Sequence, residues 1–331
     1  MKATAVAHPN LAFVKYWGKR DEALRLPAEG SISMTLSGLS VRTTVEFQEG
    51  TGKDDVIRIG GEDARGEERE RVVSFLDIAR GLAGTDLPAR VESLADFPRS
   101  AGLASSAAAF AALALAASRA AGLELRDRDL AALARQGSGS ATRSIHGGFV
   151  EWRRGARADG ADCHGVQLTP PEAWPELRLL ASVVEKVPKP CSSTEGMRRT
   201  AATSPFYSEW LALVKRDLDR ARRAIRERDL ALLGETAESN ALAMHAVCLA
   251  AWPPILYWSP GTIDVVRRIQ ALRADGVPVY LSIDAGPNVF AITDSLHEGR
   301  IRGALEELRA VESVHASAPG PGARLVEDHV F

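Results

Sequence analysis

The sequence has few cysteines and no excess charge of one sign. Only three cysteines occur among 331 residues, at positions 163, 191 and 248, and no Cys-x-x-Cys pair is present. An odd and sparse set of this kind is typical of reduced thiols, so we expect a cytoplasmic protein. The net charge of −2, without a long run of like charge, argues against binding of nucleic acid.

The sequence also lacks a long hydrophobic run. Its most apolar stretch, residues 101–123, is mostly alanine with Ser, Gly and Arg inside it, which is too weakly hydrophobic for a membrane span. The N-terminus has no long apolar stretch either, so we expect no signal peptide and no membrane partner. A chain of 331 residues can form one large domain or two medium domains with cores of their own.

Patterns of strand and helix follow one another along the chain and predict a mixed α/β fold. Period-two alternation predicts strands over residues 31–36 and 41–47. A helical period predicts further elements, over residues 67–83, 127–135, 208–228, 229–248 and 263–274. We also expect a last helix over residues 298–312, followed by a tail rich in Gly and Pro.

A stretch of small residues between Asp96 and Phe110 leads into a run of Ala and Leu that favours a helix. The free N–H groups and the positive dipole end of such a helix bind phosphate, and Ser105 and Ser106 stand at that place. An alanine-rich core helix with an ordinary serine cap is an equal alternative. No Gly-Lys-Ser/Thr follows Gly102, which excludes a Walker loop.

Three other stretches carry candidate chemistry. Residues 15–21 combine lysines, an arginine and aromatics around a glycine, which suits an anionic substrate or, alternatively, a solvated turn with one buried Trp. Residues 137–143 alternate Gly and Ser before Arg143, a pattern that favours an oxyanion site over a linker. Asp284 follows a strand and is either a base or a turn residue.

Two further features have plain structural explanations. Ser193 and Thr194 follow two prolines and are placed to cap the next helix. His245 has no Cys or His at ligand spacing, so we expect it to pack rather than to bind a metal.

The spacing Pro-x-x-x-Gly-Leu-x-Ser-Ser-Ala from Pro98 resembles the phosphate loop of the GHMP kinases. Four segments together resemble one branch of that superfamily, mevalonate diphosphate decarboxylase, in the same order and over nearly the whole chain: residues 15–21, 101–107, 137–143 and 284–288. The resemblance implies an α/β (α+β) protein with the GHMP kinase fold and a homodimer. It implies a nucleotide-binding domain over residues 1–185, a ferredoxin-like domain over 186–331, and an active site in the cleft between them.

The resemblance also implies an activity and its cofactors, ATP and Mg²⁺. Relatives phosphorylate the tertiary hydroxyl of a 3-hydroxy acid that carries phosphate at carbon 5, and they then lose phosphate and carbon dioxide to give an alkene. Asp284 matches the catalytic aspartate that accepts or orients the hydroxyl proton, and Arg143 matches the arginine that holds the carboxylate. Lys15 matches the cation near the reacting centre, and Asn10 matches a supporting asparagine.

The remaining site residues carried over from the family form two groups. The expected contacts to the substrate are Tyr16, Trp17, Gly18, Lys19, Arg71, Ser138, Gly139, Ser140, Ser193 and Thr194. The expected contacts to ATP are Pro98, Ala101, Gly102, Leu103, Ala104, Ser105 and Ser106, and Ser106 is also expected to reach Mg²⁺.

The chain departs from the family pattern at Thr142, His146, Pro188 and Pro190, which we expect at the substrate end of the site. Mevalonate 5-diphosphate and mevalonate 5-phosphate therefore both stay open as substrates. A GHMP small-molecule kinase that stops before decarboxylation is a further alternative. A nucleotide-binding regulatory protein without activity is a third, and the complete catalytic set disfavours it.

Overall fold

The computed structural model describes residues 1–48, 54–97, 105–184 and 191–331. These residues form both strands and helices, and the mixed α/β class predicted from the sequence is confirmed. No helix in the described part of the chain is both long and apolar enough to cross a membrane.

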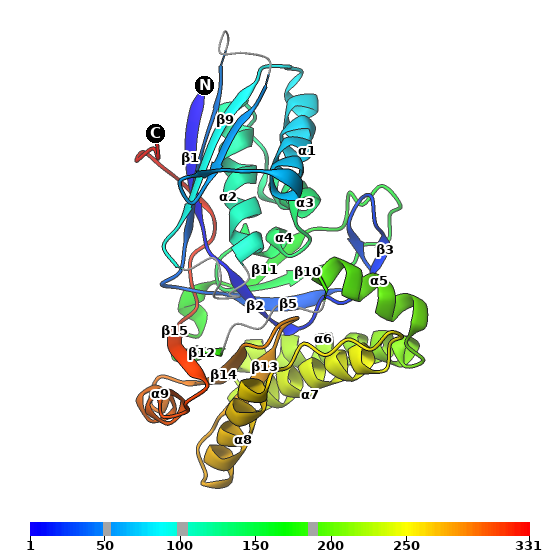
Figure 1. The fold of residues 1–331 in the computed structure, drawn as a ribbon, viewed down its shortest axis with the longest axis vertical. Coiled ribbons are helices and arrows are strands. Elements are labelled where there is room, and N and C mark those ends of the chain that lie inside the picture. Colours follow the sequence, from blue (N-terminus) through cyan, green and yellow to red (C-terminus); the bar gives the residue numbers. More distant parts are fainter. Residues whose placement is uncertain (49–53, 98–104, 185–190) are drawn as a thin grey trace.

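Strands from the first 95 residues and one strand from the C-terminus form a sheet that helices cover on one side (Figure 1). Among the described residues this sheet has six strands in the order β16-β1-β6-β9-β7-β8. Its strands are β1 (Lys2–Ala7), β6 (Val41–Phe47), β7 (Val56–Ile59), β8 (Glu62–Asp63), β9 (Ala89–Ala95) and β16 (Arg324–Val326). The covering helices are α1 (Gly66–Ala83), α2 (Ser105–Ala120) and α3 (Asp127–Gly137). Most of the alanines of α2 are fully buried, which lets this helix lie close to β1 and β6.

A second sheet, in the order β11-β10-β5-β2, lies between α4 on one side and α6 and α7 on the other (Figure 1). Its strands are β2 (Asn10–Val14), β5 (Ser31–Thr35), β10 (Phe149–Trp152) and β11 (Gly165–Thr169). The helices on its two faces are α4 (Ala141–Ser144), α6 (Tyr207–Glu227) and α7 (Leu230–Leu249). A short ribbon of β3 (Lys19–Asp21) and β4 (Leu26–Pro27) extends from this region.

The third sheet, in the order β13-β14-β12-β15, carries the last helices of the chain. It contains β12 (Leu177–Val184), β13 (Tyr280–Ile283), β14 (Val289–Asp294) and β15 (Val311–Ser317). The remaining helices are α5 (Ser193–Thr203), α8 (Pro260–Ala274) and α9 (Glu298–Glu306). The division at residues 185 and 186 stays a prediction. In the structure β12 pairs with β14 and β15, and the C-terminal β16 returns to pair with β1.

The predicted helix over residues 298–312 is wrong in its second half. Helix α9 ends at Glu306, and Val311 begins strand β15, which pairs with β12. The β-branched residues Val311 and Val314 suit that strand better than a helix. The tail after β15 packs back on the first half of the chain, where the Ala323 N–H donates to the carbonyl of Ile145.

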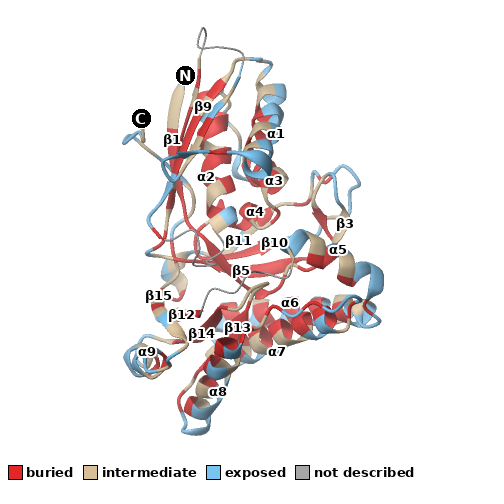
Figure 2. Cartoon of the chain, viewed as in Figure 1, coloured by how far each residue is buried: buried red, intermediate tan, exposed pale blue. Residues whose placement is uncertain are grey.

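Buried residues run along α2, β5, β10 and the inner sides of α6 and α7 (Figure 2). One apolar cluster joins Leu11 and Phe13 of β2 to Ala237 and Met244 of α7 and to Phe290 of β14. Because protein cores are close-packed, this cluster holds the second and third sheets in a fixed relation. The two sheets bring the ends of β2 and β13 to the same region.

Candidate active site

A lysine and an aspartate far apart in the sequence form an ion pair at the centre of the site. Lys15 follows β2 and Asp284 follows β13, and the Lys15 Nζ lies 2.5 Å from the Asp284 Oδ1. The Lys15 side chain is 3% exposed and that of Asp284 is 37% exposed. Burial lowers the pKa of Lys15, and the Asp284 carboxylate opposes that shift. The pair therefore presents one accessible carboxylate with a buried cation behind it.

Arg143 lies beside this pair in a cage of neutral oxygen atoms. Its Nη1 donates to Ser31 Oγ at 2.6 Å and its Nε to Ser33 Oγ at 3.0 Å, while Nε and Nη2 both donate to Asn10 Oδ1 at 3.1 and 3.0 Å. Burial lowers the pKa of Arg143 to about 10, and Asp284 opposes the shift, so the guanidinium stays charged at neutral pH. A buried cation held only by neutral partners, as far as the described residues go, is suited to receive an anion.

Asn10 connects this arginine to α4. Its Nδ2 donates to Ser144 Oγ at 2.8 Å and to the carbonyl of Ser140 at 3.2 Å, while its Oδ1 faces Arg143. The supporting role expected for Asn10 is consistent with these contacts.

Sequence reasoning missed the two serines of β5. Their alternation indicated a half-buried strand, whereas every residue of β5 is buried and the serine face points at Arg143.

The residues after Lys15 are anchored by their surroundings. The Trp17 indole is buried, donates from Nε1 to Thr200 Oγ1 at 3.0 Å, and packs edge-on against Tyr257 with ring centroids 6.1 Å apart. The Trp17 side chain is thus held against α5. Trp210 Nε1 donates to the Trp17 carbonyl at 2.9 Å and fixes that main chain.

Two glycines allow close approach near this segment. Gly18 has φ 122°, and a Cβ there would lie 1.8 Å from the Tyr207 hydroxyl oxygen. A Cβ on Gly139 would lie 2.9 Å from ring atoms of both Tyr16 and Trp152. The Tyr16 hydroxyl is buried and finds no hydrogen-bond partner within the described residues, and burial raises the pKa of Tyr16. A buried hydroxyl without a partner is a donor available to a ligand.

Further polar groups expected to contact the substrate lie on β3 and at the junction of α3 and α4. Ser138 Oγ and Ser140 Oγ, at the junction of α3 and α4, lie 3.4 Å apart. Lys19 in β3 pairs through Nζ with Glu22. Hydroxyls and an ammonium therefore come from separate segments, and each can donate to phosphate oxygens.

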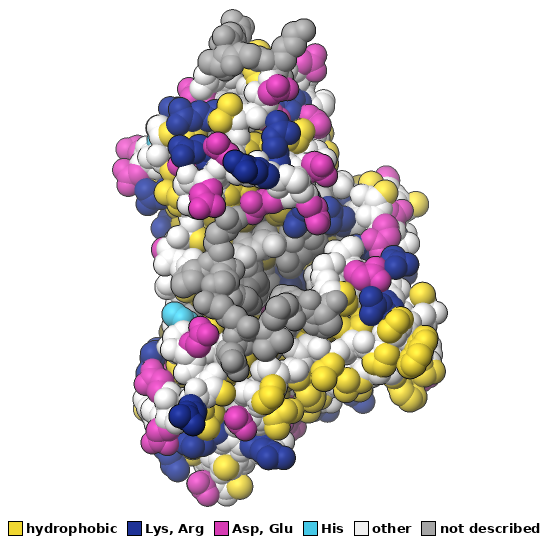
Figure 3. Space-filling model, in the orientation of Figure 1, with side chains coloured by type: hydrophobic (Ala, Val, Ile, Leu, Met, Phe, Trp, Pro, Cys, Tyr) yellow, Lys and Arg dark blue, Asp and Glu magenta, His cyan; other side chains and the backbone are white. Residues whose placement is uncertain are grey.

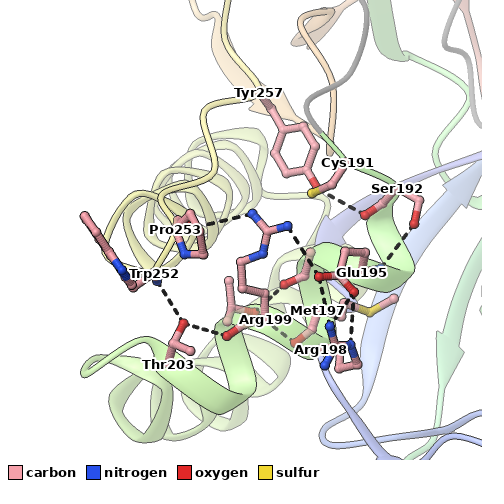
Figure 4. A network of polar contacts seen from close by, with 12 residues as sticks. Cys191, Ser192, Glu195, Met197, Arg198, Arg199, Thr203, Trp252, Pro253 and Tyr257 are labelled. Atoms are coloured by element: carbon pink, nitrogen blue, oxygen red, sulfur yellow. Dashed lines mark hydrogen bonds and ion pairs between the residues drawn. The ribbon is translucent and has the colours of Figure 1, made fainter.

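Helix α5 begins at this end of the site, but with a different cap from the one expected. The Ser192 Oγ accepts the Glu195 N–H at 3.2 Å, so Ser192 is the N-cap, and Ser193 and Thr194 are the exposed first residues of the helix. Figure 4 shows the contacts that hold α5 in place, with the Cys191 thiol beside the Tyr257 hydroxyl and Arg199 pointing to Pro253.

A cavity of about 500 Å³ lies between the six-stranded sheet, α1 and the start of α2. Its lining includes Ser105 and Ser106, together with apolar residues such as Val72, Phe110 and Leu113. Arg71 lines it as well, stacks over Phe110 at 5.0 Å, and donates from Nη2 to the Gly137 carbonyl at 3.3 Å. Arg71 therefore bridges the cavity and the Gly137–Ser140 segment. The expected ATP contacts Pro98, Ala101, Gly102, Leu103 and Ala104 lie outside the described residues.

Two departures from the family pattern do not face the substrate end, contrary to our expectation. Thr142 Oγ1 accepts the Gly165 N–H at 2.8 Å, and the His146 Nε2 lies 3.1 Å from the Gly165 carbonyl. Both side chains thus tie α4 and the residues after it to the start of β11. The other two departures, Pro188 and Pro190, lie outside the described residues.

His245 packs inside the C-terminal half, as the sequence suggested. Its ring lies 5.1 Å from the Trp258 ring and within hydrogen-bonding reach of the backbone at Ile283 and Asp284. Burial lowers the pKa of His245 to about 4, and Lys15 adds to the shift, so the ring is neutral. The described residues contain no group of three or more His, Cys, Asp or Glu side chains that could hold a metal ion.

Comparison with known proteins agrees with the arrangement of these residues. Residues 7–165 match the family described as diphosphomevalonate decarboxylase-like N-terminal domain, and residues 179–319 match the mevalonate 5-diphosphate decarboxylase C-terminal domain. The diphosphomevalonate decarboxylase of Homo sapiens is 39% identical over 319 residues, which cover 89% of this chain and 78% of the human protein.

Solved structures are similar over nearly the whole chain. Mevalonate diphosphate decarboxylase from Staphylococcus aureus has a TM-score of 0.94 and 38% identity, covering 98% of both chains. A structure described as a complex with MVAPP, AMPPCP and magnesium has a TM-score of 0.93 and 39% identity, covering 99% of both chains. The α/β architecture with the GHMP kinase fold is thereby confirmed, and the chain belongs to the diphosphomevalonate decarboxylase family.

Proposed function

We propose that this protein catalyses the ATP-dependent decarboxylation of mevalonate 5-diphosphate to isopentenyl diphosphate, ADP, phosphate and carbon dioxide. The observation that carries the proposal is the Lys15–Asp284 pair, with Nζ and Oδ1 2.5 Å apart, beside the buried Arg143. Relatives of this chain are named for the same activity. The product is a precursor for isoprenoid biosynthesis.

Arg143 binds the carboxylate of the substrate. Its guanidinium is held from three directions by Ser31, Ser33 and Asn10, so its position is fixed before the substrate arrives. A preorganised cation in a buried site interacts more strongly with an anion than it would in water, and it loses little side-chain entropy on binding. The carboxylate that later leaves as carbon dioxide is thereby oriented.

Asp284 accepts the proton of the 3-hydroxyl group as that oxygen attacks the γ-phosphoryl group of ATP. The phosphoryl group makes this oxygen a leaving group. The C3–O bond then breaks to release phosphate, the bond between C1 and C2 breaks to release carbon dioxide, and its electron pair forms the double bond between C2 and C3. Lys15 lies against Asp284 and supplies a fixed positive charge where negative charge develops.

The substrate diphosphate fits the donors of the segments around Lys15. These donors are Tyr16, the main chain at Trp17 and Gly18, Lys19, Ser138, Gly139, Ser140, Ser193 and Thr194. The Tyr16 hydroxyl, which has no hydrogen-bond partner among the described residues, and the neighbouring hydroxyls of Ser138 and Ser140 support this assignment. Thr142 and His146 point to Gly165 instead, so they give no reason to prefer mevalonate 5-phosphate.

The nucleotide fits the cavity beside α2. Its apolar wall, which includes Val72 and Leu113, suits an adenine ring, and Ser105 and Ser106 at the start of α2 offer hydroxyls and backbone N–H groups to phosphate. Arg71 lies between this cavity and the substrate segments. ATP carries Mg²⁺ on its phosphates, and Ser106 is the side chain that we propose as its protein contact. A relative has been solved with AMPPCP and magnesium.

The experiment that tests this function measures kcat/KM for mevalonate 5-diphosphate and mevalonate 5-phosphate side by side. We expect equal amounts of ADP, phosphate and carbon dioxide, and a clear preference for the diphosphate. Stable 3-phosphorylated product without carbon dioxide would establish a kinase instead. A preference for the monophosphate would contradict the substrate assignment and leave the reaction type intact.

A homodimer in the cytoplasm completes the proposal. Large apolar side chains are exposed where α5 meets α6 and where α7 ends: Phe206, Leu249, Trp252 and Leu256. Figure 3 shows hydrophobic side chains gathered over this side of the helices. A patch of this kind is commonly covered by a partner. Sedimentation of the protein and of the Trp252→Ser variant tests whether a second copy covers it.

A further inference from the structure

The Lys15 main chain is held by a buried side chain from α7. The Lys15 N–H donates to Asn240 Oδ1 at 2.8 Å, and Asn240 is fully buried. Because Lys15 is the first residue after β2, this bond fixes the place from which its side chain extends to Asp284. The orientation of the Asn240 amide therefore matters, since only its oxygen can accept this bond.

A second buried residue determines that orientation. Asp217 on α6 is 1% exposed, and its Oδ2 accepts the Asn240 Nδ2 at 2.9 Å. Its Oδ1 lies 3.2 Å from both Nε and Nη2 of Arg216 and forms an ion pair with that guanidinium. The Asp217 oxygen accepts its bond from the Asn240 amide, so the NH₂ of Asn240 faces Asp217 and its carbonyl faces Lys15.

The burial of Asp217 calls for an explanation beyond packing. A carboxylate at 1% exposure loses most of its hydration, and Arg216, its charged partner among the described residues, has a side chain that is 61% exposed. An apolar residue at this helix position would avoid the desolvation cost. The carboxylate fixes the orientation of the Asn240 amide. It disfavours the flipped amide, in which the NH₂ group would face Lys15.

We propose that Asp217 is a positioning residue for the reaction, which sets Lys15 through the amide of Asn240. The inference rests on the proposed function, because it requires Lys15 at the reacting centre. Asp217 touches neither substrate nor nucleotide. Its effect is to keep the Lys15 ammonium within contact of Asp284 as charge develops.

The test is a double-mutant cycle with Lys15. Asp217→Asn keeps the shape but allows either end of the new amide to face Asn240, so we expect kcat to fall about 10-fold, while the KM for mevalonate 5-diphosphate changes less than about threefold. In a Lys15→Ala background the same substitution should cause no further loss, because the residue through which it acts is absent. Asp219→Asn, an exposed position on the same helix, is the matched control and should behave as the unmodified protein.

A reciprocal exchange tests the direction of the bonds. Asn240→Asp alone places two carboxylates against each other and should impair activity strongly. Adding Asp217→Asn restores one donor facing one acceptor and leaves a carboxylate to accept the Lys15 N–H, so kcat should recover to within about threefold of the unmodified enzyme. The double variant also tests the proposal if the Asp217→Asn variant alone does not fold.

Several outcomes would overturn the proposal. These are an unchanged kcat in Asp217→Asn, an equal loss of kcat with and without Lys15, or a folded exchange variant without recovery. Absence of decarboxylation in the unmodified protein would instead contradict the proposed function. Activity that depends on Lys15 but not on Asp217 would contradict this inference alone.

Discussion

Gly18 lies at the point where the chain has to pass beside the Tyr207 hydroxyl with a positive φ of 122°. A methyl group there would clash with Tyr207, and a residue with a Cβ would be strained at this positive φ. We therefore expect Gly18→Ala to lower the free energy of unfolding by about 2 to 4 kcal/mol. It should also raise the KM for the phosphorylated substrate, because the neighbouring donors move. Urea unfolding and steady-state kinetics measure the two effects.

Gly38→Ala is the matched control for this prediction. Gly38 also has a positive φ, of 75°, but a Cβ there meets no atom within 4 Å, so only backbone strain of about 1 kcal/mol should appear. Adding Tyr207→Phe to Gly18→Ala removes the closest atom and should recover part of the loss. Equal destabilisation by the two glycine substitutions would contradict the role assigned to the contact.

His245 makes stability depend on pH in a predictable direction. Burial lowers its pKa from 6.5 to about 4 in the folded protein, so below pH 6.5 the unfolded chain binds the proton more tightly. The contribution of neutral His245 is complete above pH 6.5 and is lost as the pH falls to 4, by about 3 kcal/mol. The unfolding free energy of the protein should therefore fall relative to that of His245→Leu by about this amount over this range. Parallel curves would show that His245 does not titrate as described.

At the scale of single elements, helix α5 shows how a cap contributes to a site. Ser192 caps the helix whose first residues, Ser193 and Thr194, are proposed to bind phosphate. Ser192→Ala should cost about 1 kcal/mol and loosen the first turn, which raises the KM for the substrate by up to about fivefold. The measurement is KM together with the melting temperature.

Asp229→Ala provides the comparison, because Asp229 caps α7 through the Leu232 N–H at 2.9 Å. Removing this cap should cost similar stability without a change in KM, since the start of α7 is remote in sequence from Asn240. A rise in KM with both variants would mean that general loosening, and not the α5 turn, affects binding.

Elements with a strong local pattern could be predicted from the sequence. The Ala/Leu run is α2, and the alternation at residues 41–47 is β6 with the same bounds. The local sequence pattern gave the wrong secondary structure where pairing between distant strands determines it. Residues 311 and 312 were predicted as the end of a helix and residues 313–317 as part of the tail, but together they form β15, which pairs with β12. The strand over residues 31–36 was predicted to be half-buried, because alternation does not reveal the buried Arg143 that contacts Ser31 and Ser33.

For the whole molecule, the site depends on contacts between distant segments. Lys15 and Asp284, 269 positions apart, meet because one apolar core joins β2 to α7 and β14. The resemblance in sequence identified both residues. It could not give the cage around Arg143 or the Asp217–Asn240 contact, since these arise only when α6, α7 and β2 pack together. Loss of an internal cation in such a site affects catalysis more than folding.

The central claim is that one carboxylate, Asp284, receives the hydroxyl proton beside Lys15 and Arg143. The most direct measurement is the release of ADP and carbon dioxide per turnover by the unmodified protein and by Asp284→Asn. We expect equal amounts from the unmodified protein and a fall of both by about 10²- to 10⁴-fold in the variant, with ATP binding retained. Unchanged turnover in Asp284→Asn, or ADP release without carbon dioxide from the unmodified protein, would contradict the claim.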